Sequence, residues 1–189
     1  GTGIKLALDT GRSTSDAITS KATMLLLGVE SGAHVEYSTD VGKTWIENFT
    51  PIEGVNKVMA RQIDVAGNES GPSNVLTFTL DAQAPISPLV SLKVDTGSSV
   101  DDGLTNNPTL NISGLETGAL VQYSTDAGLN WGALYRPVSG SNTVSVRQID
   151  LAGNISLVSA DFTFTLDTVA ALAPGVELVN DTGSSNSDK

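Results

Sequence analysis

"RQIDVAGNES" (residues 61–70) returns as "RQIDLAGNIS" (residues 147–156), and this repetition decides how the chain is organised. The two copies lie 147 − 61 = 86 positions apart, and the same offset relates "YSTDVGKTW" to "YSTDAGLNW". A fixed internal period is the signature of a tandem repeat, and a unit of this length can bury a core of its own. We therefore expect repeat 1 over residues 1-82, repeat 2 over 83-168, and the first strand and loop of a truncated third repeat over 169-189.

Apolar and polar residues alternate over short runs in both units. In "VLTFTLD", Leu76, Phe78 and Leu80 alternate with threonines, which is typical of a β-strand with one buried face. Clusters of Gly with Asp, Asn or Ser end every run, and helical spacing is nowhere sustained. The pattern predicts an all-β protein: tandem immunoglobulin-like β-sandwich domains of seven strands, stacked end to end. The side chains predicted to point inward are Ile4, Leu6, Leu8, Leu76, Phe78, Leu80, Val90, Leu92, Val94, Val144, Val146, Phe162, Phe164 and Leu166.

Composition excludes several classes of function. The net charge is −11, from 21 acidic and 10 basic residues, so neither a nucleic-acid partner nor an anionic bilayer is expected, whereas a divalent cation is. No run of 18 apolar residues is present, so we expect no direct membrane insertion. The chain has no cysteine, and its one histidine, His34, aligns with Leu120 in the second unit. We therefore predict no enzyme, no catalytic residue and no organic cofactor, and His34 is expected at the surface.

The "YSTDxG" stretches are expected to form hairpin turns. Gly42 and Gly128 would take the left-handed backbone conformation, and turn chemistry is the favoured explanation for Asp40 and Asp126. Strand direction alternates in a sandwich, so this turn, the "DTG" loop and the end of the last strand share one pole, and "DxAGN" lies at the other. The repeated aromatic residues could form a sugar platform, but sandwich packing is favoured because they recur at matched positions. These residues are Tyr37, Trp45, Tyr123 and Trp131.

Four motifs in a fixed order, "DTGSSxxD", "YSTDxGxxW", "RQIDxAGN" and "FTLD", carry a resemblance over essentially the whole chain. The chain resembles the bacterial Ig-like extender repeats of giant type I secreted RTX adhesins. The resemblance implies an extracellular, cell-surface stalk of calcium-stiffened sandwiches that holds a terminal ligand-binding domain away from the cell, with cell adhesion and biofilm formation as its setting. Arg12 stands where the second unit has Ser98, and Ser15 where it has Asp101, so weaker ion binding is expected in the first loop.

In a head-to-tail array of such repeats, acidic loops of neighbouring units meet. Asp9, Asp16 and Asp81 of the first unit would face Asp150 and Asn154 of the second. Calcium takes six to eight oxygen ligands from carboxylates, amides and carbonyls, and this set supplies them. The alternative left open is that these residues only serve turns. The remaining candidate metal ligands, at the equivalent positions of the other poles, are Asp64, Asn68, Asp95, Asp102 and Asp167.

Two kinds of function follow from the sequence. The favoured one is a structural extender whose partners are the neighbouring repeats of the same chain. The linker "DAQAPISP" (residues 81–88) is expected to have few contacts crossing it and to hinge unless calcium ties the units together. The alternative is a module that itself binds a glycan or protein ligand, for which the stretch around Tyr135 is a weak candidate.

Overall fold

The computed structural model describes residues 2–177, 179 and 184, and this part of the chain consists of strands, turns and loops without a helix. Accordingly, the described residues include no helix long and apolar enough to cross a membrane. The strands of unit one (residues 1–82) are β1 (Gly3–Leu6), β2 (Ile18–Thr19), β3 (Met24–Leu27), β4 (His34–Ser38), β5 (Gly54–Ile63) and β6 (Leu76–Leu80). Those of unit two (residues 83–168) are β7 (Leu89–Leu92), β8 (Leu104–Thr105), β9 (Leu110–Ser113), β10 (Leu120–Ser124), β11 (Gly140–Ile149) and β12 (Phe162–Leu166).

Each unit is a sandwich of two sheets. In unit one, β1 pairs with β3, and the second sheet has the order β2-β6-β5-β4. Unit two repeats both sheets, with β7 paired to β9 and the order β8-β12-β11-β10. The pairs β4–β5 and β5–β6 are antiparallel, whereas β2 runs parallel to β6. The predicted all-β fold of tandem immunoglobulin-like sandwiches, stacked end to end, is confirmed.

The strand count differs from the expected seven, since the structure has six strands in each unit. The segment 39–53 of unit one makes only an isolated bridge, between Tyr37 and Ile46. Asn56 explains why a strand is not needed here, because its side chain accepts from the Ile52 N–H at 2.9 Å and donates to the Ile52 carbonyl at 2.7 Å. A side chain thus satisfies backbone groups that a neighbouring strand would otherwise pair.

The first predicted strand of each unit ends earlier than expected. β1 stops at Leu6, and the chain then crosses to the other sheet and forms β2. Leu8 and Val94, which were predicted to point inward, are instead 59% and 51% exposed. These two predictions are wrong because both residues follow the last paired position of the strand, where the alternation no longer has a sheet to face.

Each unit has its own core between its two sheets. In unit one, Ile4 of β1 packs with Val58 and Ala60 of β5 and with Phe78 of β6. In unit two, the fully or nearly fully buried apolar side chains of the long strands are Val144, Val146, Phe164 and Leu166. Of these core residues, the inward orientation of Ile4, Phe78, Val144, Val146, Phe164 and Leu166 was predicted correctly, whereas Val58 and Ala60 of β5 were not among the predicted residues.

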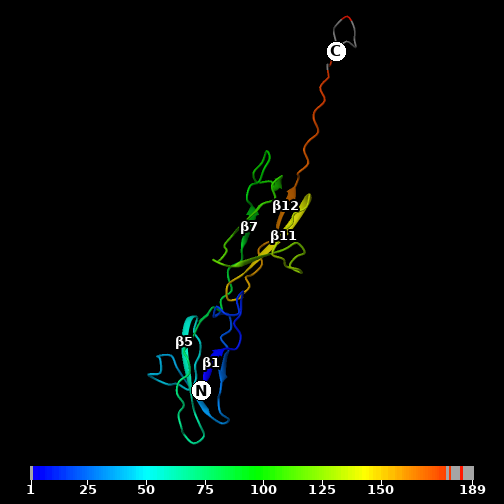
Figure 1. Ribbon diagram of the computed structural model, residues 1–189. Coiled ribbons are helices and arrows are strands. Elements are labelled where there is room, and N and C mark those ends of the chain that lie inside the picture. The colour runs from blue at the N-terminus through cyan, green and yellow to red at the C-terminus, as the bar shows by residue number, and fades with distance from the viewer. Residues whose placement is uncertain (1, 178, 180–183, 185–189) are drawn as a thin grey trace.

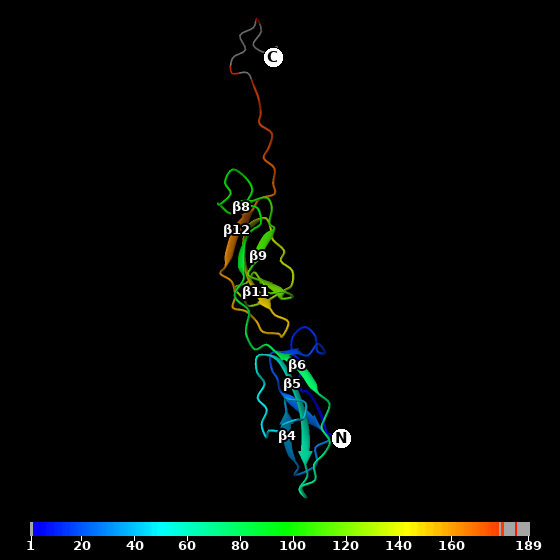
Figure 2. The same cartoon turned by 90° about the vertical axis from the view of Figure 1, so that its left-hand side faces the viewer.

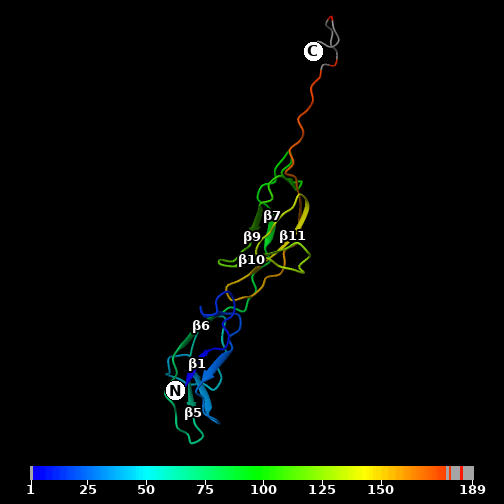
Figure 3. The ribbon, with the colours of Figure 1, turned by 45° about the vertical axis from the view of Figure 1, so that its right-hand side comes forward.

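The molecule is long and narrow (Figure 1). Unit one, with the N-terminus, lies at one end, and unit two continues along the same direction (Figures 1 and 2). Beyond β12 the chain runs away from unit two, as Figure 3 also shows. Residues 169–177 form no strand there, and the predicted loop of a third repeat lies outside the described residues.

Candidate functional site

The DTG loop of unit one (residues 9–17) is organised around a threonine hydroxyl. The Thr10 hydroxyl accepts from the Ser20 N–H at 2.7 Å and lies 3.1 Å from the Thr19 hydroxyl. Asp9 Oδ2 accepts from the Ala17 N–H at 2.8 Å, where Ala17 has the unusual φ of 59°. These bonds fix the loop without any contribution from the acidic residues of the partner unit.

The DTG loop of unit two (residues 95–103) repeats this arrangement. Asp95 Oδ2 accepts from the Gly103 N–H at 2.8 Å, and the Thr96 hydroxyl accepts from the Asn106 N–H at the same distance. In both loops the second carboxylate oxygen, Oδ1 of Asp9 and of Asp95, is buried and has no hydrogen-bond partner. A buried acceptor without a donor is costly, and its recurrence in both units marks a place where a cation would fit.

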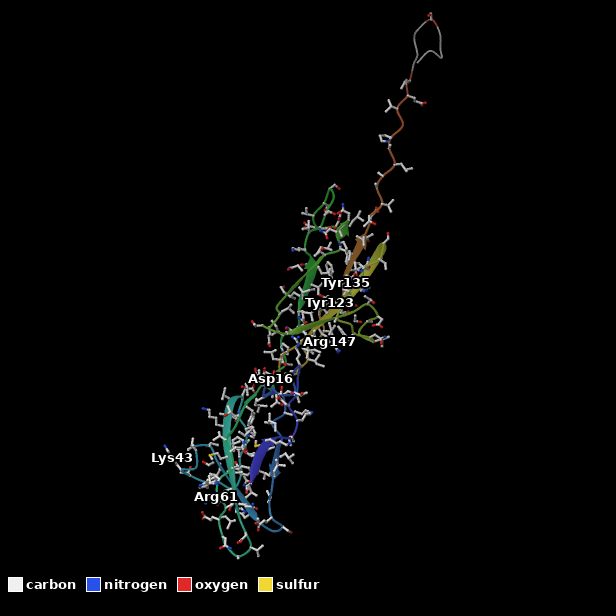
Figure 4. All side chains as sticks on the ribbon, viewed as in Figure 1. Asp16, Lys43, Arg61, Tyr123, Tyr135 and Arg147 are labelled. Atoms are coloured by element: carbon white, nitrogen blue, oxygen red, sulfur yellow. The ribbon has the colours of Figure 1, made fainter. Side chains whose placement is uncertain are left out.

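Direct hydrogen bonds join the two units. The Thr10 hydroxyl donates to the Ala152 carbonyl at 2.6 Å, and the Asn154 side-chain amide donates to the Asp81 carbonyl at 2.7 Å. Asp16 also lies where the units meet (Figure 4). The expected scarcity of contacts at the linker is therefore wrong, because side chains from the loops of one unit bond to the backbone of the other.

Arg12, the departure from the repeated motif, belongs to this junction. Its guanidinium donates to the Gly118 carbonyl of unit two at 3.2 Å. The linker itself is also held, since Gln148 of unit two donates to the Ile86 carbonyl at 2.8 Å and the Ser87 hydroxyl donates to the Val158 carbonyl at 3.0 Å.

Two glycines let the backbones of the units approach closely. A Cβ on Gly11 would lie 2.0 Å from the Leu151 carbonyl oxygen, and a Cβ on Gly153 would lie 2.9 Å from the Gly11 nitrogen. Both glycines also have positive φ, 93° and 94°. Only glycine meets both requirements, so the residues of "DTG" and "AGN" are fitted to each other as well as to their own turns.

The AGN loops (residues 64–68 and 150–154) are closed by their own side chains. Asp150 accepts from the Asn154 N–H and side-chain amide, each at 2.8 Å. Asp64 makes the same two bonds with Asn68, and these bonds, the side-chain one first, lower the pKa of Asp64. The carboxylates of these loops therefore act first as caps of their own turns.

The structure brings some of the predicted ligands together and not others. The Asn154 side-chain amide contacts both the Asp81 backbone carbonyl and the Asp150 carboxylate, and Asp150 is 3% exposed. Asp64 and Asn68 lie in the loop that follows β5 and bond to each other. In the described part of the chain, no three His, Cys, Asp or Glu side chains are grouped so that they could hold a metal ion. An ion at the junction would therefore draw on carbonyl, amide or water oxygens as well as carboxylates.

At the far pole of unit two, acidic residues line two hollows. The first, of about 480 Å³, has Asp95, Asp101 and Asp102 in its wall. The second, of about 260 Å³, is lined by Asp102 and by Asp167 at the end of β12. The predicted ligands of this pole thus face open space on neighbouring parts of one surface.

The turn interpretation of the "YSTD" aspartates agrees with the structure. Gly42 and Gly128 have φ of 82° and 84°. The Thr44 amide, followed by the Thr44 and Ser38 hydroxyls, lowers the pKa of Asp40 to about 2. The Asn130 side chain and amide do the same for Asp126, whose pKa is also about 2. Each carboxylate is used by its own turn.

The tryptophans lie outside the core, so their predicted sandwich packing is wrong. Trp45 and Trp131 are each half-buried beneath an arginine, with Arg61 4.6 Å and Arg147 4.2 Å from the ring centroid. Cation–π contact with the adjacent strand holds the rings at the surface instead. Tyr37 does pack against the core. His34 is exposed as expected.

Sequence reasoning missed an apolar hollow in unit one. It measures about 470 Å³ and is lined in part by Ile46, Phe49, Ile52 and Val55. Ile52 and Val55 are 68% and 65% exposed. The available signal was the break in the repeat, because unit two has a polar Ser141 in place of Val55.

Unit two carries an aromatic pair in the corresponding region. Tyr123 and Tyr135 stack with ring centroids 5.9 Å apart, and Figure 4 shows them near Arg147. Burial raises the pKa of Tyr135, whose hydroxyl has no hydrogen-bond partner. Tyr135 itself is half-buried, whereas its neighbours Leu134 and Arg136 are exposed.

No protein-family model matches the sequence, and no curated protein matches it. Among solved structures, the fibronectin(III)-like modules of Clostridium thermocellum CbhA are similar. The likeness has a TM-score of 0.44 and 14% sequence identity, and it covers 93% of this chain and 100% of that one. The fold assignment rests on the strand pairing and cores described above.

Proposed function

We propose that the chain is a stretch of the extended, non-catalytic stalk of a bacterial surface adhesin, of the kind built from Ig-like extender repeats in giant type I secreted RTX adhesins. Its work is mechanical: it holds a distal ligand-binding domain away from the cell. The observation that carries the proposal is the junction, in which loops that recur in each unit join the units end to end. A spacer needs such a contact between successive units, whereas an isolated binding module does not.

Calcium is the proposed stiffening ion. The buried Asp9 Oδ1 and Asp95 Oδ1, which lack hydrogen-bond donors, support a cation at each DTG loop. Asp16 and Asp102, in the same two loops, would contribute further carboxylate oxygens, and Asp150 and Asp81 retain acceptor capacity beside the first loop. When bound, calcium supplies positive charge that neutralises oxygens brought together from both units.

Small-angle X-ray scattering with calcium and with chelator tests this function. We expect an extended particle in both conditions, with a narrower distribution of interdomain distances when calcium is present. A compact particle would overturn the spacer, and an unchanged distribution would overturn the stiffening by calcium while leaving the spacer in place.

A second candidate function is favoured by the apolar hollow of unit one. Its exposed Val55 is replaced by the polar Ser141 in unit two, whereas Ile52 has an exposed apolar counterpart in Val138, so Val55 is the feature specific to unit one. Under this alternative the module itself binds an apolar segment of a protein or glycan. Binding of the isolated chain on a glycan or peptide array, lost in Ile52→Ser and Val55→Ser, would select this function.

A further inference from the structure

The arginine of the repeated "RQID" stretch has different partners in the two units. Figure 4 labels both copies, Arg61 in unit one and Arg147 in unit two. Arg61 is held by two carboxylates, with Glu36 at 2.7 Å and Glu69 at 2.6 Å. Arg147 donates from Nε to the neutral Gln122 at 2.8 Å and, within the described part of the chain, belongs to no ion pair. Its positive charge is therefore not neutralised by its own unit.

Two substitutions at equivalent positions account for this difference. Gln122 stands where unit one has Glu36, and Ile155 stands where it has Glu69. Both changes remove a carboxylate beside the arginine, although the chain as a whole has 21 acidic residues against 10 basic ones. Unit two thus keeps a cation on this surface and loses the anions that accompany it in unit one.

Arg147 is placed to bind a carboxylate from outside the unit. Its Nε is used by Gln122, so the two terminal nitrogens of the guanidinium are left as donors. Trp131 lies 4.2 Å from the guanidinium carbon, measured to the ring centroid, and this contact holds the planar group in place. A half-buried, oriented guanidinium of this kind can make paired hydrogen bonds to a carboxylate.

A hollow of about 350 Å³ lies beside Trp131. Tyr135 and a second basic residue, Arg136, are part of its wall. Asp126 also lines it, but its carboxylate accepts from the Asn130 N–H at 2.9 Å and from the Asn130 side-chain amide at 2.6 Å, within its own turn. Aromatic walls with a few polar groups suit a sugar ring, which presents both C–H faces and hydroxyls.

This surface is separate from the junction between the units. Gln122 and Arg147 are paired across β10 and β11, and the neighbours of Arg147 along the strand, Val146 and Gln148, are buried in the unit. Because side chains alternate between the two faces of a strand, Arg147 lies on the outer face of the sheet. The site is therefore on the side of the long molecule, where repeats stacked end to end leave it accessible.

We propose that unit two binds an acidic sugar, a hexuronic acid residue of a polysaccharide, with its carboxylate on Arg147 and its ring beside Trp131. The Gln122 amide, whose oxygen accepts from Arg147, has its nitrogen left to donate to a sugar hydroxyl. The hollow favours a sugar over an acidic peptide, because an aspartate or glutamate side chain would bring no ring to fill it. The proposal goes beyond the stalk function, does not depend on calcium, and concerns a different unit from the apolar hollow.

Nuclear magnetic resonance of the ¹⁵N-labelled chain tests this proposal. Each unit has one tryptophan, so the two indole N–H signals, assigned with Trp45→Phe, report on the two units separately. We expect methyl glucuronide to shift the Trp131 signal with a dissociation constant on the order of 1 mM and to leave the Trp45 signal in place. Methyl glucoside, which has a neutral hydroxymethyl group in place of the carboxylate, should bind roughly tenfold or more weakly, because it leaves the guanidinium unpaired.

Gln122→Glu gives unit two the carboxylate that Glu36 supplies in unit one. It should weaken binding of methyl glucuronide by roughly tenfold or more, because the new carboxylate occupies the Arg147 guanidinium. Gln83→Glu is the matched control, since it makes the same change of charge at an exposed position of the linker and should leave binding unchanged.

A Trp131 signal that methyl glucuronide does not shift would overturn the proposal. Equal binding of methyl glucoside would do the same, and so would equal losses in Gln122→Glu and Gln83→Glu, because binding would then not depend on the unpaired Arg147. Acetylglutamate amide is the third probe. If it binds as tightly as methyl glucuronide or more tightly, the sugar assignment is wrong and the site is one for an acidic peptide.

Discussion

Gly11→Ala should uncouple the two units while leaving each folded. The added Cβ would lie 2.0 Å from the Leu151 carbonyl oxygen and 3.0 Å from the Ala152 carbonyl carbon. Non-bonded heavy atoms rest roughly 3.5 Å apart, so the loops must separate by about 1.5 Å. The junction bonds of 2.6 to 3.2 Å would then exceed hydrogen-bonding distance.

The cost follows from those three bonds, which join Thr10, Arg12 and Asn154 to backbone carbonyls of the other unit. At about 1 kcal/mol each, their loss weakens docking by about 3 kcal/mol, or roughly 100-fold in the ratio of docked to undocked molecules. An alanine with this φ also costs about 1 to 2 kcal/mol of local strain, whatever surrounds it.

Gly97→Ala is the control that separates the two effects. Gly97 has a φ of 108°, so alanine is strained there too, but its Cβ would come no closer than 3.9 Å to the Leu104 carbonyl oxygen. Electron–electron double resonance between nitroxides on Lys57→Cys and Thr143→Cys reports the distance between units, and the absence of native cysteine keeps the labelling specific. We expect a broad distribution for Gly11→Ala and a narrow one for Gly97→Ala. Equal distributions in the two variants would refute the reasoning.

Three further predictions concern the acidic and basic side chains. Asp9→Asn should raise the melting temperature in chelator, because it removes a buried anionic oxygen that has no hydrogen-bond partner. In the wild type we expect calcium to raise the melting temperature by several degrees, and this rise should be smaller in Asp9→Asn. An unaltered calcium response in calorimetry would reject the site. The pKa values of Asp40 and Asp126, both about 2, lie below the unfolded value of 3.8. Their contribution to stability is therefore present above about pH 4 and is lost as the pH falls towards about 2. The denaturation midpoint of Asp40→Asn should depend less on pH between about pH 4 and pH 2 than that of the wild type. Arg61→Met should destabilise the chain by about 1 to 2 kcal/mol and reduce its salt dependence, since two ion pairs and the contact with Trp45 are lost; chemical denaturation at low and high salt measures both.

The strands were predictable where alternation and burial coincide. Phe78 and Val146 occupy paired positions inside long strands, and their burial follows from the period of two. Leu8 and Val94 continue the same alternation past the end of pairing, and a one-dimensional pattern cannot show where a sheet stops. The early end of the first strand and the parallel β2 were therefore not foreseen.

The residues that meet at the junction were partly predictable from the sequence, whereas the hydrogen bonds between them were not. The sequence indicated that Asp81 and Asn154 would meet, but as shared ligands, whereas the structure joins them by an amide-to-carbonyl hydrogen bond. The contact of Thr10 and Gly11 with the other unit was not predicted, because threonine and glycine are common in turns whether or not another unit binds them. Their role became visible only when Ala152 was placed against them.

The strength of one junction bears on why a stalk would use calcium as well as direct bonds. A docking free energy of about 3 kcal/mol leaves roughly one junction in 150 open, and this open fraction is negligible for a chain with a single junction. In an array of about a hundred such units, however, close to half of the molecules would contain an open joint at any moment, by the same population ratio. A junction without an equivalent of Arg12 would open more often still. An ion present at 100 times its dissociation constant, and bound only when the loops are closed, adds about 2.7 kcal/mol and lowers the open fraction by roughly a further hundredfold. The unpartnered oxygens of Asp9 and Asp95 would then be the positions where a long stalk gains the rigidity that hydrogen bonds alone do not provide.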